Sequence, residues 1–401
     1  MSYVGCRNSK FEGRTSKRIR ITKFEGRIRR YFGFRFSDLF RISRFGLQIL
    51  LLLLVCGNAN AQISNLKRDQ EVVFFPTLAC RCASNCWELN IRGCVYEPDK
   101  RTIALALLRA GLGLEHVSLT PAENKLFAER ARLFMVDHKE GKKIVVRIGD
   151  AEFTLPKTGA NGEFSTALQL SDGQVEKLRN LGAAFKAVLP AKDSRVFAGE
   201  LSFFDDSGVI VISDIDDTIK ITQVRDRKAT LRNTFLEPFQ PVPGMPEVYH
   251  EWAEKAGAQF CYVSASPWQL YSPLADFIRS NGFPAGVFYL KSFRWKDESF
   301  FNLFEGPEKY KPTVIKPLME RFPNRKFIFV GDSGEKDPEI YGALAREHLQ
   351  QVTKILIRNV TEEGPEAERY KAAFRDLPET LWKVFREPAE IAKECPEKDI
   401  R

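Results

Sequence analysis

The chain has 401 residues, of which 44% are hydrophobic and 28% charged, a globular balance with room for roughly two or three domains. Its formal charge of +9 comes from residues 1–61, which hold thirteen basic and three acidic side chains. Residues 62–401 hold 48 basic against 49 acidic side chains, so no nucleic-acid partner is predicted.

Residues 1–61 are expected to be a signal peptide with a long basic first part. A basic stretch precedes the apolar run at 47–56, which is shorter than the ~20 residues of a transmembrane helix. Ala59-Asn60-Ala61 has the small-x-small pattern of a cleavage site. We therefore predict an exported protein, periplasmic or secreted, that starts at Gln62. An uncleaved membrane anchor is the alternative.

Four of the eight cysteines lie close together in one stretch, as Cys80, Cys82, Cys86 and Cys94. Their spacing is not the paired C-x-x-C of zinc sites, and in an oxidising compartment two disulfides are favoured over a metal. The pairing stays open. Cys261, inside an apolar run, is expected to be a core thiol, and Cys395 to lie in a polar tail.

Residues 62–200 are expected to form a small β-rich accessory domain with one or two helices. Residues 87–98 alternate apolar with polar side chains, and the same period of two recurs at 142–156 and 163–170. The stretches 101–113 and 121–136 are helical in pattern, the second beginning at Pro121. His116 and His138 are expected to be surface or turn residues.

Residues 201–395 show a different pattern, in which short apolar runs alternate with helical stretches. The runs are 209–213, 259–264, 286–290, 326–331 and 354–360; the helices are 246–256, 268–281, 312–322 and 338–348. This succession predicts a Rossmann-like α/β domain, a parallel sheet covered on both faces. Ligands of such sheets bind at the carboxyl ends of the strands.

The first of these strands runs directly into Asp214, Asp216 and Asp217, three carboxylates that should repel one another. A hard cation such as Mg²⁺ prefers oxygen ligands and would offset that repulsion, so we predict a divalent metal here. A solvated acidic turn is the alternative. An EF-hand is excluded because Ile219 stands where that loop requires glycine.

The later strands also end in polar residues. Ser264 lies at the end of the second, and Asp332 ends the fourth, with Asp337 five residues later. Asp337 precedes Pro338, so it could instead be a helix N-cap. Between them, Lys309, Lys311 and Lys316 surround the start of a helix.

Together these residues carry a resemblance. The D-x-D-x-T at 214–218, Ser264, a downstream lysine and the G-D-x-x-x-x-D at 331–337 resemble the four motifs of the haloacid dehalogenase phosphatase superfamily. The stretches "SDIDDTIK", "YVSASPWQLY" and "FVGDSGEKDPEIY" resemble one of its families, the actin-patch-associated phosphatidate phosphatases, over roughly residues 199–359. The "FFPT" of the β-rich region resembles the domain that precedes the catalytic one in that family.

The resemblance implies a role for each matching residue. Asp214 would be the nucleophile, forming an aspartyl phosphate, and Asp216 the acid and then the base. Ser264 and Lys311, with Lys309 as the alternative, would hold the phosphoryl group. Mg²⁺ would be held by Asp214, the backbone carbonyl of Asp216 and Asp332, with Asp337 as a further partner of the metal.

The resemblance therefore implies a Mg²⁺-dependent phosphatidate phosphatase that acts on a phosphorylated lipid at a membrane surface. The gaps between the motifs, mostly assigned to loops and single helices, leave room only for a minimal cap. The segment 290–306 mixes cations with aromatic residues such as Trp295 and Phe300, which suits a membrane interface or simple packing under the sheet. The alternatives are a phosphatase of another, soluble phosphomonoester, and a non-catalytic envelope binding protein.

Overall fold

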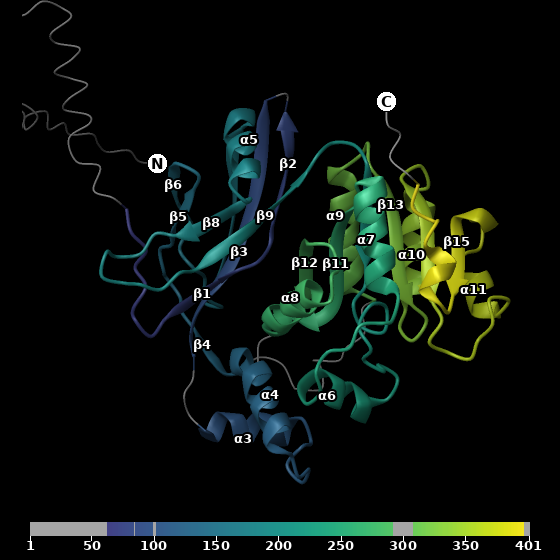
Figure 1. The fold of residues 1–401 in the computed structure, drawn as a ribbon, viewed down its shortest axis with the longest axis horizontal. Helices are drawn as coiled ribbons and strands as arrows, with labels where there is room; N and C mark the ends of the chain where they lie inside the picture. Colours follow the sequence, from purple (N-terminus) through teal and green to yellow (C-terminus); the bar gives the residue numbers. More distant parts are fainter. Residues whose placement is uncertain (1–61, 84, 99–101, 292–307, 397–401) are drawn as a thin grey trace, which may run out of the picture. The chain divides into compact units, whose positions relative to one another are not determined.

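The computed structural model describes residues 62–83, 85–98, 102–291 and 308–396 (Figure 1). The predicted signal peptide and the segment with Trp295 and Phe300 lie outside the described residues. Among the helices that are described, none combines the length and the apolar character needed to span a bilayer.

The first region is built around a nine-stranded sheet within the described part of the chain. Its path is β1-β3-β2-β9-β8-β5-β6, with β4 and β7 also paired to β3. The strands are β1 Glu71–Phe74, β2 Thr77–Ala83, β3 Cys86–Pro98, β4 Val136–His138, β5 Val145–Ile148, β6 Ala151–Thr154, β7 Glu163–Ser171, β8 Ala184–Ala187 and β9 Ala198–Phe204. The β-rich prediction is confirmed. The predicted alternation in β3 buries Trp87, Leu89 and Ile91 in one core cluster.

Three described helices accompany this sheet. They are α3 (Thr102–Gly111), α4 (Pro121–Ala131), which continues into η2 (Arg132–Met135), and α5 (Asp172–Asn180). The helix α5 was not predicted, although Ser171 and Gln174 form a capping box at its start. It packs Val175 and Leu178 on the first sheet. In contrast, α3 and α4 bury their apolar residues in a cluster shared with the second sheet.

Two disulfides were predicted among the four cysteines between residues 80 and 94, but the described structure contains one. Cys82 and Cys86 are bonded to each other, but Cys80 and Cys94 are free thiols. Cys94 lies in β3 opposite a valine of β1 and a glutamate of β7, so neither neighbouring strand offers it a cysteine. Cys80 instead accepts a hydrogen bond from Arg321 at 2.8 Å. Cys395 was expected in a polar tail, yet it is buried in an apolar cluster.

The second sheet is parallel throughout, which confirms the predicted α/β domain. Its strands are β10 Val209–Ser213, β11 Gln259–Pro267, β12 Gly286–Lys291, β13 Lys326–Asp332, β14 Val352–Arg358 and β15 Trp382–Phe385. They lie in the order β12-β11-β10-β13-β14-β15, the doubly wound Rossmann order. In this order the connections change direction between β10 and β13, where a ligand crevice is expected.

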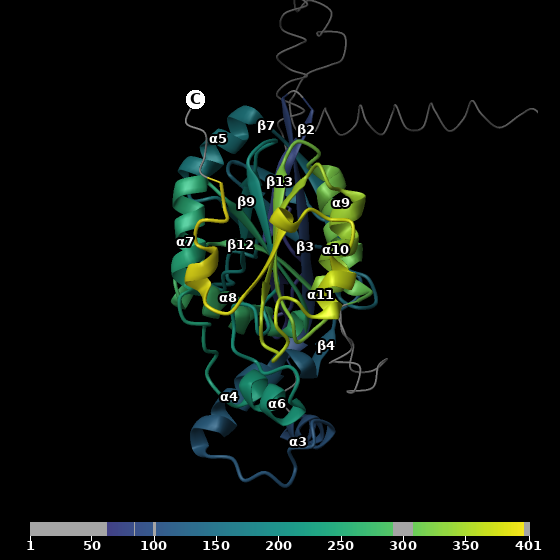
Figure 2. The same ribbon diagram turned by 90° about the vertical axis from the view of Figure 1, so that its right-hand side faces the viewer.

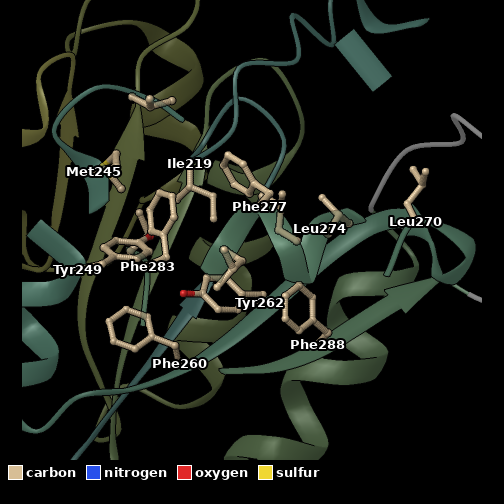
Figure 3. Packing of buried hydrophobic residues seen from close by; sticks show 14 of the residues in the cluster. Ile219, Met245, Tyr249, Phe260, Tyr262, Leu270, Leu274, Phe277, Phe283 and Phe288 are labelled. Carbon is tan, nitrogen blue, oxygen red and sulfur yellow. The ribbon is translucent and has the colours of Figure 1, made fainter. Parts of the chain in front are cut away.

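Helices cover both faces of this sheet (Figure 2). They are α6 Arg227–Phe235, α7 Met245–Ala256, α8 Tyr271–Ser280, α9 Tyr310–Arg321, α10 Asp337–Glu347 and α11 Glu368–Ala373, with short turns η3 Trp268–Leu270, η5 Glu379–Leu381 and η6 Pro388–Ile391. The helices α7 and α8 pack on one face, where Tyr249, Phe260 and Tyr262 lie together (Figure 3). The helices α9 and α10 pack on the other.

The chain passes from the first sheet to the second through residues 205–208, so β9 spans the predicted boundary at 200–201. Arg325, 2% exposed, fixes this connection by donating hydrogen bonds to the carbonyls of Asp205 and Val209. The gap between β10 and β11 was predicted to hold one helix, but it also contains α6. This helix is short and polar, which hid it. Its one sequence signal is the N-cap Asp226, which accepts from two backbone N–H groups.

Candidate active site

The structure gathers the predicted site residues at the carboxyl ends of β10, β11 and β13. Asp214 directly follows β10, and Asp332 ends β13 on the neighbouring strand. Lys311 reaches the same place from the first turn of α9. All the predicted site residues are buried: Asp214, Asp216, Ser264, Lys311, Asp332 and Asp337.

Three of the acids form an oxygen-only cluster. Single carboxylate oxygens of Asp214, Asp332 and Asp337 lie within 4.8 Å of one another. One oxygen of Asp332, Oδ2, is buried with no hydrogen-bond partner in the described residues. A Cβ atom at position 331 would lie 2.2 Å from an oxygen of Asp337. Glycine at this position therefore leaves room for the Asp337 carboxylate. Mg²⁺ prefers carboxylate oxygens as ligands. Among the described residues, these buried oxygens lack sufficient hydrogen-bond donors from the protein, so the cluster fits that ion.

Lys311 is the one lysine of the predicted three that reaches this cluster. Its Nζ lies 2.8 Å from Asp214 Oδ1, donates to Asp337, and lies 3.6 Å from Glu335. Lys309 is exposed at the N-cap of α9, and Lys316 pairs with a surface glutamate.

The buried carboxylates outnumber the lysine, and this imbalance shifts every pKa in the cluster. Burial, with the neighbouring carboxylates, raises the pKa of Asp214 and Asp332 well above the usual range, against the lowering effect of Lys311. Burial would lower the pKa of Lys311, but Asp214 and Asp337 outweigh it and raise the pKa. A divalent cation would relieve the excess negative charge.

The carboxylate of Asp216 points away from this cluster, into a second set of partners. Lys220 Nζ lies 2.7 Å from Oδ1, and Thr222 donates to the same oxygen at 2.7 Å. Ser264 and Ser266 donate to Oδ2 at 3.1 and 2.8 Å. Burial alone would raise the pKa of Asp216, but Lys220 and the hydroxyls hold it at about 2. Asp216 was predicted to bind the metal through its backbone carbonyl, and its carboxylate is not part of the metal cluster.

Asp217, the third of the acidic residues that follow β10, has a structural role. Its φ of 55° places it in the left-handed region. Its carboxylate accepts hydrogen bonds from the backbone N–H groups of Thr222, Gln223 and Val224 at 2.7 to 2.8 Å. The three neighbouring acids therefore point in three directions, which the sequence did not show.

Asp337 was also considered as an N-cap, and that alternative is wrong. Lys336 occupies the N-cap position of α10, and Asp337 is the first helical residue. Its Oδ2 accepts from the backbone N–H of Asp332 at 3.3 Å. The side chain is thus held inside the cluster, next to Asp332.

A small cavity of about 90 Å³ adjoins Asp216. Its walls include Ser264, Ser266 and Glu335, and also Thr230 and Thr234 of α6. Burial raises the pKa of Glu335 to about 7, with Asp337 and Asp216 adding to the effect and Lys311 opposing it. Sequence reasoning missed Lys220, Thr222, Glu335 and the two threonines, and it located Ser266 at the strand end without giving it a role. Only Lys220 and Thr222 offered a signal, as polar residues that alternate with isoleucines after the acidic run.

Comparison with known proteins gives this site a context. Residues 209–359 match the family described as phosphatidate phosphatase APP1, catalytic domain. The phosphatidate phosphatase APP1 of Saccharomyces cerevisiae is 39% identical over 154 residues, which are 38% of this chain and 26% of the yeast protein. An uncharacterised protein of Schizosaccharomyces pombe is 29% identical over 170 residues, 41% of this chain and 27% of its own length.

This chain therefore spans about a quarter of the length of these curated relatives. The matched range begins at the first residue of β10 and ends just after β14, so it contains Asp214, Ser264, Lys311, Asp332 and Asp337. Residues 209–359 of this chain are thus similar to the catalytic-domain family of phosphatidate phosphatase APP1.

Proposed function

We propose that this chain is a Mg²⁺-dependent phosphatidate phosphatase of the haloacid dehalogenase type, which hydrolyses its substrate to diacylglycerol and phosphate. The observation that carries the proposal is the buried cluster of Asp214, Asp332 and Asp337 beside Lys311, within the matched range. The similarity to the yeast phosphatidate phosphatase APP1 supports the lipid substrate.

In the first step, Asp214 attacks phosphorus and forms an aspartyl phosphate, while the bond from phosphorus to the glycerol oxygen breaks. Thr218 donates to Asp214 Oδ2 at 2.9 Å, and Lys311 lies at 2.8 Å from Oδ1. These two contacts hold the carboxylate in one orientation. Lys311 and the hydroxyl of Ser264 would also bind the phosphoryl oxygens.

Asp216 handles the protons of both steps. The glycerol oxygen must take a proton as it leaves, whereas the pKa of about 2 makes Asp216 a carboxylate in the free protein. The proton can enter with the substrate, because a phosphomonoester has a second pKa of about 6, and Asp216 would accept it from the phosphate and pass it to the leaving glycerol oxygen. In the second step, Asp216 takes a proton from the water that attacks the aspartyl phosphate and releases inorganic phosphate.

Asp214, Asp332 and Asp337 would hold Mg²⁺, together with the backbone carbonyl of Asp216. When bound, the ion neutralises charge on the phosphate oxygens. Lys311 already lies among these carboxylates, so it keeps them together and lowers their mutual repulsion.

The export and the membrane contact are part of the same proposal, supported by the sequence of residues 1–61 and of 290–306. N-terminal sequencing of the protein recovered outside the cytoplasm should give Gln62 as the first residue. Thiol counting after denaturation should then find four free cysteines, those at 80, 94, 261 and 395. An N-terminus at Met1 in a cytoplasmic fraction would contradict the export.

The test of the activity is phosphate release by the purified chain from a panel of substrates, with Mg²⁺ and with a chelator. Phosphatidate in mixed micelles, glycerol phosphate and an aryl phosphate make up the panel. We expect phosphatidate to be the best substrate and the chelator to abolish release. A clear preference for glycerol phosphate would favour the soluble-substrate alternative, and no release from any substrate would favour a binding protein.

A further inference from the structure

One wall of the catalytic cavity depends on a helix from the preceding region of the chain. The wall is α6, and α4 packs against it (Figure 1). The ring of Phe235 in α6 contacts those of Phe127 in α4 and Phe134 in η2, at centroid distances of 6.1 and 5.7 Å. At the other end of the contact, Arg232 of α6 pairs with Glu123 of α4 at 2.7 Å. The cover of the site is therefore assembled from two separate segments.

Arg130 of α4 is the buried charge in this contact. Its side chain is 5% exposed, and Nη1 donates to the carbonyl of Thr234 at 2.8 Å. The guanidinium lies 3.8 Å from the ring centroid of Phe239. Within the described residues it has no carboxylate in salt-bridge range, and its Nε has no hydrogen-bond partner. A buried cation without an ion pair costs stability, so its two specific contacts require an explanation.

Both contacts lead to the catalytic cavity. The first is direct, because Thr234 lines the cavity. The second runs through Phe239, whose ring centroid also lies 4.8 Å from Nζ of Lys220, the lysine paired with Asp216. Arg130 thus fixes α6 on one side and supports the ring next to Lys220 on the other.

The two threonines of α6 that line the cavity differ in how their hydroxyls are used. The hydroxyl of Thr230 donates to the carbonyls of Gln223 and Asp226, at 2.9 and 2.8 Å. The hydroxyl of Thr234 makes no hydrogen bond in the part of the chain that the structure describes. Thr234 is 7% exposed and shares the cavity with Asp216, the residue that serves the leaving oxygen in the proposed mechanism.

We propose that the Thr234 hydroxyl contacts the alcohol part of the substrate next to the phosphate, and that Arg130 is a positioning residue that holds Thr234 there. This rests on the proposed phosphatase function. Because Arg130 belongs to α4, the region before residue 200 would contribute to substrate selection. The site thereby recognises a hydrogen-bonding group on the leaving alcohol, such as an ester oxygen of a glyceride.

The test is steady-state kinetics of the purified chain with two substrates, phosphatidate in mixed micelles and an aryl phosphate. The aryl phosphate lacks the carboxylic-ester oxygens of a glyceride. Thr234→Val removes the hydroxyl at constant shape, and Arg130→Met removes the charge at similar length. One lost hydrogen bond corresponds to a factor of roughly 2–12, so each variant should raise KM for phosphatidate by about fivefold. The value of kcat should change less than KM, and KM for the aryl phosphate should rise less than that for phosphatidate.

Two further variants test whether Arg130 positions Thr234 or only stabilises the fold. They are the double variant, which combines Arg130→Met with Thr234→Val, and the conservative variant Arg130→Lys. If Arg130 acts through Thr234, the double variant should be no worse than the poorer single one. Arg130→Lys should recover part of the lost affinity. Arg132→Met is the matched control, because Arg132 is the next arginine and pairs at the surface with Glu71. It should leave both substrates unaffected.

Unchanged kinetics of Thr234→Val in an active enzyme would overturn the substrate contact. Equal losses of kcat on both substrates by Arg130→Met and Arg130→Lys, with a lower melting temperature, would reduce Arg130 to a structural residue. A wild-type chain that releases phosphate from neither substrate would instead overturn the proposed function. The two failures are therefore distinguishable.

Discussion

Asp214 and Asp216, the proposed nucleophile and the proposed proton-transfer residue, are only two positions apart, yet their carboxylates have different partners. Asp214 shares Lys311 with two other acids, while Asp216 has Lys220 and three hydroxyls to itself. The structure thus gives two aspartates opposite charge environments, as acid–base chemistry often requires. Asp217 stabilises the turn that follows them, by accepting hydrogen bonds from the backbone N–H groups of Thr222 and Gln223.

Substitution of these two aspartates should affect turnover unequally. Asp214→Asn removes the attacking charge and a proposed metal ligand, so phosphate release should fall below detection. Asp216→Asn should lower kcat by about 10²–10⁴-fold, the usual size of acid–base assistance. Asp276→Asn, a surface acid paired with Arg279, is the control for the loss of one charge. Turnover by Asp214→Asn near that of the wild type would contradict the covalent mechanism.

Gly331 should be irreplaceable for a steric reason. A methyl group there would lie 2.2 Å from Oδ2 and 2.7 Å from Cβ of Asp337. Because Asp337 begins α10, it cannot move aside without shifting the helix. Gly331→Ala should therefore weaken Mg²⁺ binding, measured by calorimetry, and lower kcat/KM by tenfold or more, an estimate of about 1.4 kcal/mol in the transition state.

Gly364→Ala is the matched control for that substitution. Its added methyl group would meet no atom within 4 Å, and its backbone needs no positive φ. It should bind Mg²⁺ and turn over substrate as the wild type does. If Gly331→Ala behaved in the same way, the metal would not depend on the position of Asp337.

At the scale of the elements, the strands β3, β5 to β7 and β10 to β14 and the longer helices followed from sequence patterns, whereas α6, like α5, did not. Six of the nine residues of α6 are polar, and its buried residues are Thr230, Leu231, Thr234 and Phe235. The intrinsic helix propensity of the residues predicts little for such a short helix, because its stability comes from packing against other elements. The gap before β11 therefore holds one helix more than predicted, and this helix lines the cavity through Thr230 and Thr234.

The segment 290–306 supplies a prediction that rests on its sequence alone. Cations and aromatic side chains favour an anionic membrane interface. Replacement of both Trp295 and Phe300 by alanine should lower hydrolysis of phosphatidate in vesicles more than hydrolysis of an aryl phosphate. Leu349→Ala removes an exposed apolar side chain elsewhere and is the control. Equal loss on both substrates would remove the case for membrane contact.

At the scale of the whole molecule, the buried acids link stability to pH and metal. Glu335 has a pKa of about 7 in the folded chain against 4.5 as its ordinary value. The folded state therefore binds a proton more tightly between these values, and stability from this group rises as pH falls from about 7 to 4.5. Asp216 acts in the opposite direction, but only below 3.8, where its low pKa takes effect.

The melting temperature of the metal-free chain should consequently be higher near pH ~5.5 than near pH ~8. Mg²⁺ should raise it more at the higher pH, because protons no longer compete for the carboxylates. Glu335→Gln should flatten the dependence in chelator. Scanning calorimetry with chelator and with Mg²⁺ measures both effects. A metal-free chain that is more stable at the higher pH would show that other groups dominate.

Local sequence patterns were sufficient to predict the parallel sheet and the residues at its strand ends. Continuous apolar runs mark strands covered on both faces, and the carboxyl ends of such strands meet at one edge. That local logic was enough to place Asp214, Ser264 and Asp332 together. The same short-range patterns indicated a β-rich region before the sheet.

The direction of each side chain at that edge depends on contacts between segments that are far apart in the sequence. The direction of Asp216 depends on Lys220 and Ser266, and the free state of Cys94 depends on which strands flank β3. The pairing of α4 with α6 joins residues 104 positions apart, Arg130 and Thr234. Such contacts are set by packing between distant segments, which no local periodicity encodes, and they shape the wall of the cavity.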